Sequence, residues 1–111
     1  MDIQSTVILI TGAAQRVGRA VAIALAKRGA NIAFSYYSDD EPWRDTSAEI
    51  KACGVNVYAQ KADVTSRESI QSLVNNVIGE YGRIDVLINN ASVWLKKPVM
   101  EITEEEWDLE L

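Results

Sequence analysis

The sequence predicts an α/β fold of the Rossmann type, a doubly wound parallel sheet with helices on both of its faces. Three observations support this prediction. Short apolar runs alternate with segments of helical periodicity, and the first run ends in a glycine turn that leads directly into a helical pattern. The fourth apolar run, residues 84–88, is nearly continuous, which is typical of a strand buried on both faces. We expect the 111 residues to belong to one domain.

The elements follow one another without a linker, a repeat or a low-complexity segment. Gly29 should end the first helix, while Asp40 could cap the second helix with Pro42 in its first turn. Thr65 and Glu68 are spaced as a capping box for the third helix. The pattern predicts strands near 7–10, 31–37, 55–60 and 84–88, and helices near 19–28, 43–53, 66–80 and from about 103 onward.

Composition excludes several classes of function. The formal net charge of −5 disfavours a nucleic-acid partner, so any phosphate site must be local. The sequence has no His and only one Cys, Cys53, which excludes a His-based metal site and an intramolecular disulfide; we expect no metal. No apolar run approaches the length of a membrane span, and residues 1–6 lack the basic start of a signal peptide. A cytoplasmic protein is expected.

The turn between the first strand and the first helix is the main candidate for a ligand site. Gly12 follows the strand, and Gly18 comes six residues later, where the helical pattern has begun. The first N–H groups of a helix lack partners inside the helix and carry partial positive charge, so a phosphate can bind there when small residues let it approach. The same pattern also fits an ordinary strand–helix turn in an α/β protein.

Two motifs resemble those of the short-chain dehydrogenase/reductase family. Residues 11–18, Thr-Gly-Ala-Ala-Gln-Arg-Val-Gly, are similar to its T-G-x-x-x-G-x-G phosphate loop, with Arg16 in place of the second Gly. Asn89-Asn90-Ala91-Ser92 is similar to its N-N-A-G motif, with Ser92 in place of Gly. The resemblance implies an oxidoreductase whose nicotinamide dinucleotide is bound by Thr11, Gly12, Arg16, Val17 and Gly18 at the phosphates, by Asp63 and Val64 at the adenine, and by Asn90, Ala91 and Ser92 at the nicotinamide ribose.

The end of the second predicted strand indicates which dinucleotide is bound. An acidic residue there would favour NAD, because it accepts a hydrogen bond from the ribose 2′-OH and repels a 2′-phosphate. The sequence has Tyr36, Tyr37 and Ser38 instead, and Arg16 could supply positive charge. We therefore expect NADP(H). An ordinary strand end with solvated tyrosines is the alternative.

Arg16, Ser92 and the aromatic residue Trp94 together resemble the pteridine reductases and dihydromonapterin reductases within the family. That resemblance implies a pterin substrate, with Trp94 stacked on the flat heterocycle and Ser92 and Arg16 bonding to it. Arginine at this loop position also occurs in acyl-carrier-protein reductases and sugar dehydrogenases, so a 3-oxoacyl thioester or a sugar is the alternative substrate.

The family's catalytic Tyr-x-x-x-Lys pair is missing from this sequence. The residues four positions after Tyr36, Tyr37, Tyr58 and Tyr81 are Asp, Glu, Ala and Asp. We therefore expect no catalytic residue in residues 1–111, which would be the dinucleotide-binding half of a domain that lacks its remainder and is inactive alone. A homo-oligomer is expected for a full-length member. A non-catalytic nucleotide-binding fragment and an inert fragment that needs a partner are the alternatives.

Overall fold

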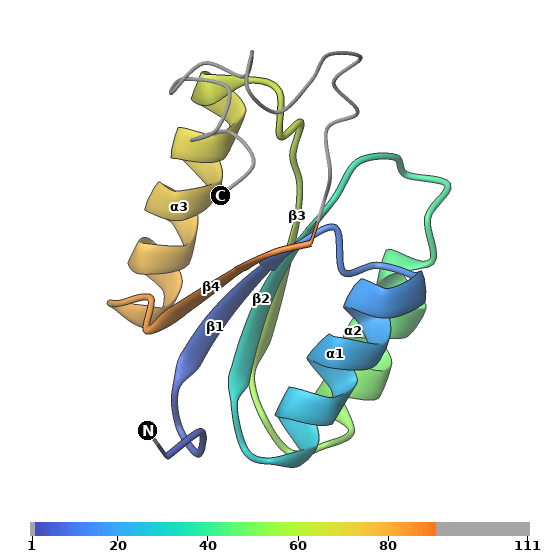
Figure 1. Cartoon of the computed structure of the whole chain (residues 1–111), viewed down its shortest axis with the longest axis vertical. Helices are drawn as coiled ribbons and strands as arrows, with labels where there is room; N and C mark the ends of the chain where they lie inside the picture. Colours follow the sequence, from blue (N-terminus) through green and yellow to red (C-terminus); the bar gives the residue numbers. More distant parts are fainter. Residues whose placement is uncertain (1, 91–111) are drawn as a thin grey trace, which may run out of the picture.

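Residues 2–90, which the computed structural model describes, form a parallel sheet between two layers of helices (Figure 1). Along the chain the elements are β1 (Val7–Thr11), α1 (Arg16–Lys27), β2 (Asn31–Tyr36), α2 (Trp43–Lys51), β3 (Val57–Lys61), α3 (Arg67–Tyr81) and β4 (Val86–Asn89). Every strand and helix predicted before residue 90 is present, with ends that shift by at most three residues. The helix predicted from about 103 lies outside the described residues.

The sheet has the order β3-β2-β1-β4, and every pair of neighbours is parallel. In the middle of the sheet, Leu9 of β1 pairs with Ala33 of β2 on one side and with Leu87 of β4 on the other. The strand order therefore reverses at β1, with β2 and β3 on one side and β4 on the other. In such sheets a ligand binds outside the carboxyl ends of the strands, next to that reversal.

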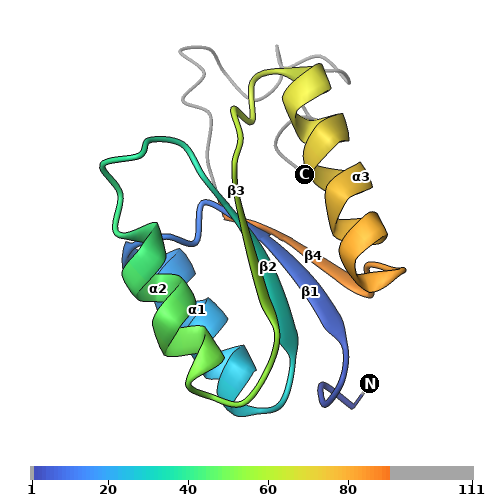
Figure 2. The ribbon, with the colours of Figure 1, turned by 180° about the vertical axis from the view of Figure 1, so that it is seen from behind.

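The two faces of the sheet bury two separate apolar clusters. Figures 1 and 2 show α1 and α2 on one face and α3 on the other. Side chains alternate along a strand, so Ile8 and Ile10 of β1 pack on the first face while Val7 and Leu9 pack on the second, with Leu73 and Val77 of α3. This two-sided arrangement confirms the predicted fold class. None of the helices in residues 2–90 is both long and apolar enough to cross a bilayer.

The prediction that the fourth strand is buried on both faces was wrong. Leu87 is 51% exposed, and the other residues of β4 are half-buried. The physical reason is position: β4 is the outer strand of the described sheet, and the cluster under α3 includes Ile84 but not Leu87. An apolar sequence therefore indicated a strand correctly but not how deeply it is covered.

Two helix starts also differ from the prediction. Pro42 is the N-cap residue of α2, which has no side-chain cap, so Asp40 does not serve as one. The cap of α3 is Ser66, one residue later than the predicted Thr65, and its Oγ accepts a hydrogen bond from the N–H of Ser69 at 3.2 Å. Thr65 instead bonds to Asp63.

Candidate functional site

The turn between β1 and α1 is held in shape by Ser35 of β2. Gly12 has a φ of 68°, in the left-handed region that suits glycine. Its N–H donates to Ser35 Oγ at 3.1 Å, and the N–H of Ala13 donates to the Ser35 carbonyl at 3.1 Å. The protein thus engages the first two N–H groups of the turn itself, and the groups left for a ligand are those at the start of α1.

The N-terminus of α1 is open to an anion. Its N-cap residue, Gln15, makes no side-chain capping bond, and the first turn contains no acidic residue. The unpaired N–H groups and the helix dipole therefore present partial positive charge that no carboxylate of the helix neutralises. Arg16, the first residue of α1, adds an exposed guanidinium. Its backbone φ of 58° lies in the left-handed region, which residues other than glycine rarely adopt.

Gly18 allows α1 to start close to the strand ends. A Cβ built at Gly18 would lie 2.5 Å from Asn90 Nδ2, 2.6 Å from the Gly12 carbonyl oxygen and 2.9 Å from Ala13 Cα. Atoms cannot approach so closely without a shift, and the carbonyl and Cα belong to backbone. The short distance between helix and turn therefore requires glycine at this position.

The two asparagines after β4 connect that strand to the turn. Thr11 Oγ1 donates to Asn89 Oδ1 at 2.9 Å and accepts from the N–H of Asn90 at 3.1 Å, while Asn90 Nδ2 donates to the Gly12 carbonyl at 3.0 Å. Asn90 thus bonds through its side chain to the backbone that follows a neighbouring strand. Asn89 Nδ2 is buried without a hydrogen-bond partner among residues 2–90. Ala91, Ser92 and Trp94 lie outside the described residues.

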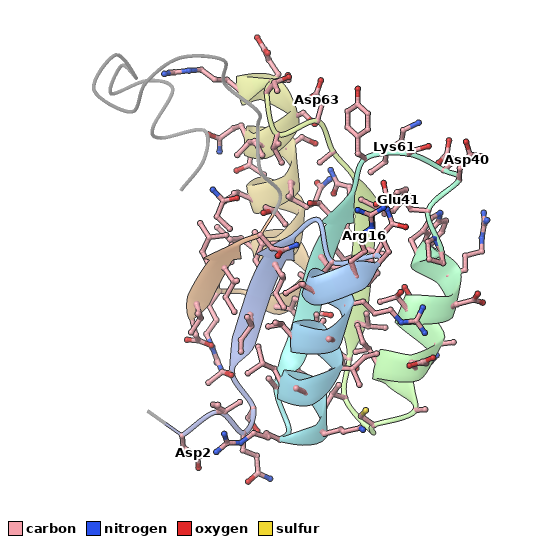
Figure 3. All side chains as sticks on the ribbon, turned by 45° about the vertical axis from the view of Figure 1, so that its right-hand side comes forward. Asp2, Arg16, Asp40, Glu41, Lys61 and Asp63 are labelled. Atoms are coloured by element: carbon pink, nitrogen blue, oxygen red, sulfur yellow. The ribbon has the colours of Figure 1, made fainter. Side chains whose placement is uncertain are left out.

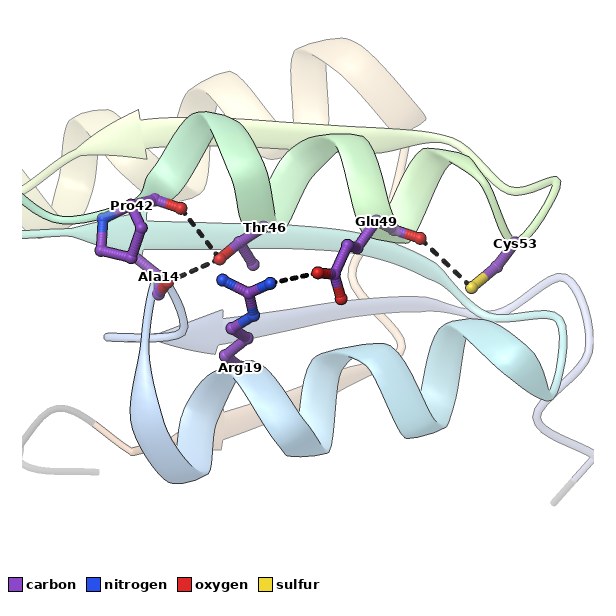
Figure 4. Close-up of polar contacts among 6 residues, drawn as sticks. All are labelled: Ala14, Arg19, Pro42, Thr46, Glu49 and Cys53. Atoms are coloured by element: carbon purple, nitrogen blue, oxygen red, sulfur yellow. Dashed lines mark hydrogen bonds and ion pairs between the residues drawn. The ribbon is translucent and has the colours of Figure 1, made fainter.

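Thr46 of α2 contacts the turn between β1 and α1, and this contact was not predicted from the sequence. Its hydroxyl is fully buried, 2.5 Å from the carbonyl oxygen of Ala14 and 3.0 Å from that of Pro42, and can donate its proton to one of them at a time (Figure 4). An ion pair between Arg19 of α1 and Glu49 of α2 joins the same two helices. The turn between β1 and α1 is therefore held by contacts from β2, β4 and α2 without any ligand.

The carboxyl end of β2 differs from the sequence-based picture. Tyr36 is only 8% exposed and stacks on Trp43, with ring centroids 4.7 Å apart, whereas Tyr37 is 68% exposed. Ser38 Oγ accepts from the N–H of Asp40 at 3.2 Å. Of the three predicted hydroxyl residues, Tyr37 and Ser38 line a pocket and Tyr36 packs into the core, because its ring pairs with the indole.

Charged residues surround the carboxyl end of β2, and two of them, Glu41 and Lys61, were not predicted as site residues from the sequence. One oxygen of Glu41, Oε2, accepts from the N–H groups of Tyr37 and Ser38 at 2.7 and 2.6 Å. Lys61, the last residue of β3, forms an exposed ion pair with Asp39 at 3.1 Å. Figure 3 shows Arg16, Asp40, Glu41, Lys61 and Asp63 at the same end of the sheet, opposite Asp2.

A pocket of about 410 Å³ lies between the ends of β2 and β3. Asp63, which we expect to contact the adenine, lines this pocket, but its Oδ1 already accepts from the N–H and the hydroxyl of Thr65 at 2.9 and 2.6 Å. These two bonds stabilise the carboxylate and lower the pKa of Asp63. Val64 is half-buried and is not part of the lining, which consists of Tyr37, Ser38, Lys61, Ala62, Asp63 and Ser69.

The described residues fit a dinucleotide. The open N-terminus of α1 and the close approach at Gly18 suit a diphosphate, and the pocket beyond β2 suits the adenosine. Asn89 Nδ2 is a buried donor at the end of β4, the strand beside the reversal in strand order. Among the described residues no cluster of acidic, Cys or His side chains could hold a metal ion.

Comparison with known proteins identifies relatives of this chain. It is 36% identical over 100 residues to the 3-oxoacyl-(acyl-carrier-protein) reductase FabG of Staphylococcus aureus, covering 90% of this chain and 41% of that protein. It is 37% identical over 102 residues to the hydroxynaphthalene reductase-like protein Arp2 of Metarhizium acridum, covering 92% and 38%. The chain thus spans about two fifths of the length of these curated relatives. Neither of the two is named as a pteridine reductase.

Solved structures share the fold. A protein of Burkholderia cenocepacia described as a dehydrogenase, solved with bound NADP, superposes with a TM-score of 0.80 at 32% identity, covering 98% of this chain and 42% of that one. A short-chain dehydrogenase/reductase of Serratia marcescens gives a TM-score of 0.80 at 26% identity, covering 99% and 45%. The sequence profile described as short chain dehydrogenase matches residues 6–111. The chain therefore belongs to the short-chain dehydrogenase family.

Proposed function

We propose that residues 1–111 are the NADP(H)-binding half of a short-chain reductase domain. The observation that carries this proposal is the N-terminus of α1, which has neither a side-chain cap nor a first-turn acid and lies against the strand ends because residue 18 is glycine. A ligand with a diphosphate satisfies the N–H groups that the helix leaves unpaired. The NADP bound in the Burkholderia cenocepacia relative supports the choice of dinucleotide.

Each group of residues has a proposed role that depends on the strand end at which it lies. The backbone from Ala14 to Val17 and the guanidinium of Arg16 bind the diphosphate, while the pocket between β2 and β3 takes the adenosine. The side chains of Asn89 and Asn90 fix the end of β4 beside the nicotinamide ribose. When bound, the cofactor supplies the hydride. Since this sequence has no Tyr-x-x-x-Lys pair, the proton donor belongs to the second half of such a domain.

For the substrate we propose a pterin, held by Arg16, Ser92 and Trp94. The support is the resemblance to the pteridine reductases, which have an Arg, a Ser and an aromatic residue at these three positions, together with the exposed position of Arg16 at the start of α1. A 3-oxoacyl thioester is the second candidate, which the relative in Staphylococcus aureus favours. The two substrates differ in shape: the pterin is a flat heterocycle that an indole can stack on, and the thioester is a flexible chain.

Cofactor binding is tested by titrating NADPH and NADH into the 111-residue chain and measuring the heat of binding. We expect NADPH to bind more tightly than NADH, and no oxidation of NADPH by the chain alone. Tighter binding of NADH would overturn the choice of NADP(H). Binding of neither would overturn the dinucleotide site.

The substrate is tested on the NADP-saturated chain, by fluorescence titration with dihydrobiopterin and by calorimetric titration with an acetoacetyl thioester. We expect the pterin to bind, and Trp94→Ala to weaken it by about tenfold, equivalent to the loss of one aromatic stacking contact. Phe or Tyr at position 94 is the matched control, since each keeps an aromatic face. Unchanged pterin affinity in Trp94→Ala, or binding of the thioester alone, would contradict the pterin assignment.

A further inference from the structure

The loop after β2 contains an anion that belongs to the protein. Glu41 Oε2 accepts hydrogen bonds from two successive backbone N–H groups, those of Tyr37 at 2.7 Å and Ser38 at 2.6 Å. Two adjacent N–H groups that converge on one negatively charged oxygen form an arrangement with which proteins also bind phosphate oxygens. The carboxylate therefore occupies a small anion site at the strand end.

The position of this anion site matters because β2 ends where the adenosine ribose of a dinucleotide lies. Both residues whose N–H groups bind Glu41, Tyr37 and Ser38, also line the pocket between β2 and β3. Lys61, at the end of β3, is the one lysine or arginine among the lining residues. A phosphate on the ribose 2′ position would meet the same N–H groups that now bind Glu41.

The local charge reduces the affinity of this position for a phosphate. Residues 39–41 are Asp, Asp and Glu, and the Lys61 ammonium is already paired with Asp39 at 3.1 Å. A phosphate and the Glu41 carboxylate cannot accept from the same two N–H groups at once, and two anions at that distance repel each other. An unphosphorylated ribose needs neither N–H group and leaves Glu41 in place.

We propose that Glu41 acts as an internal substitute for the 2′-phosphate and so reduces, without reversing, the preference of this site for NADP(H). NADP(H) binds only by displacing the carboxylate from the N–H groups of Tyr37 and Ser38, so Glu41 lowers the affinity for the phosphorylated dinucleotide and leaves the affinity for the unphosphorylated one unchanged. This inference rests on the proposed dinucleotide site. It assigns a role to a residue that the sequence alone marks only as one acid among three.

The experiment compares two fragments of the cofactor, adenosine 2′,5′-bisphosphate and adenosine 5′-monophosphate, by calorimetric titration into the whole chain. In Glu41→Ala we expect the bisphosphate to bind about tenfold more tightly, because the competing charge is gone. Glu41→Gln keeps a side-chain oxygen for the two N–H groups but removes the charge, so its gain should be smaller. The monophosphate should change by less than about twofold in both variants.

Asp40→Asn is the matched control. It removes one negative charge from the same loop, but the Asp40 carboxylate makes no hydrogen bond or ion pair within residues 2–90. We expect this variant to bind both fragments as the native chain does. Equal gains for the bisphosphate in Asp40→Asn and Glu41→Ala would overturn the proposal, because net charge alone would then explain the effect.

Two other results distinguish the inference from the proposed function. If both fragments bind but Glu41→Ala leaves their ratio unchanged, or weakens the monophosphate, Glu41 is not a substitute for the 2′-phosphate while the dinucleotide site stands. If neither fragment binds to the native chain or to any variant, although the variants unfold at the same temperature as the native chain, the dinucleotide site itself is wrong and the inference falls with it.

Discussion

Two helices of this molecule, α1 and α3, begin at the same edge of the sheet, yet their first turns are built differently (Figure 1). At α3, Ser66 caps the helix, Glu68 lies in the first turn, and the N–H of Asp63 donates to Ser69 Oγ at 2.8 Å. At α1, the N-cap residue makes no side-chain bond and the first turn has no acid. One helix start is closed by the protein, and the other is left open.

The glycines within the two helices differ in the same way. A Cβ on Gly18 of α1 would meet two backbone atoms within 3 Å, whereas a Cβ on Gly79 of α3 would meet no atom within 4 Å. Glycine in α1 is therefore needed for a close approach, and glycine in α3 only weakens its helix. The two helices thus differ both at their first turns and at their glycines, and these differences make the start of α1, and not that of α3, the candidate ligand site.

The largest expected effect comes from Gly18→Ala. The added Cβ collides with the Gly12 carbonyl, so the turn must shift; we expect a loss of roughly 1–3 kcal/mol in the free energy of unfolding and no measurable NADPH binding. Urea denaturation and calorimetric titration measure the two quantities. Gly79→Ala is the matched control, which should gain about 0.5–1 kcal/mol and bind NADPH normally. Equal behaviour of the two variants would contradict the account.

The next largest effect is expected from giving α1 the cap that α3 has. Gln15→Asp places a carboxylate where it can accept from the first N–H groups of α1, so we expect the helix to be stabilised by about 1 kcal/mol and NADPH affinity to fall at least about tenfold. The converse change, Ser66→Ala, should cost about 1 kcal/mol and leave binding unchanged. If Gln15→Asp bound NADPH as tightly as the native chain, the open helix start would not be the phosphate site.

A smaller effect is expected from substitutions of Arg16. Comparing Arg16→Gly with Arg16→Ala distinguishes the effect of backbone strain from the effect of charge. The φ of 58° at this position costs a residue with a side chain roughly 1 kcal/mol, so Arg16→Gly should raise the free energy of unfolding by about that amount while weakening NADPH binding. Arg16→Ala should weaken binding equally without the gain, because alanine keeps the strain. A stability gain of the same size in both variants would show that strain is not its source.

The smallest effect concerns pH and the closed start of α3. The bonds from Thr65 lower the pKa of Asp63 below its ordinary 3.8, so the carboxylate stabilises the fold above that pH, and this contribution is lost as the pH falls through the lowered value. In Asp63→Asn, whose side chain does not titrate, the free energy of unfolding should depend less on pH below about 4. An unchanged pH dependence would show that the two hydrogen bonds do not favour the charged form.

The sequence predicted the parts of this structure that depend on local patterns. Strands and helices follow from periodicity, and the tight turn between β1 and α1 from Gly12 and Gly18, because the residues that decide these features are neighbours in the chain. The choice of Ser66 over Thr65 as a cap was missed because both side chains can cap, and the backbone conformation decides between them. Such errors shift an end by one residue without changing the fold.

The contacts that shape the candidate site were not predictable in the same way. Ser35 and Thr46 bond to a turn 23 and 32 residues away in the sequence, and no local pattern marks either of them. Glu41 could be recognised only after the loop had brought its carboxylate onto the N–H groups of Tyr37 and Ser38. The burial of Leu87 was overestimated because it depends on what covers the edge strand.

The most direct test is a titration of NADPH into the ¹⁵N-labelled chain, followed by the chemical shifts of the assigned backbone N–H groups. The account predicts the largest shifts between residues 14 and 18, at the open start of α1, and small shifts between residues 66 and 69, at the capped start of α3. Large shifts at 66–69 with 14–18 unchanged would contradict the claim that the uncapped helix terminus binds the diphosphate.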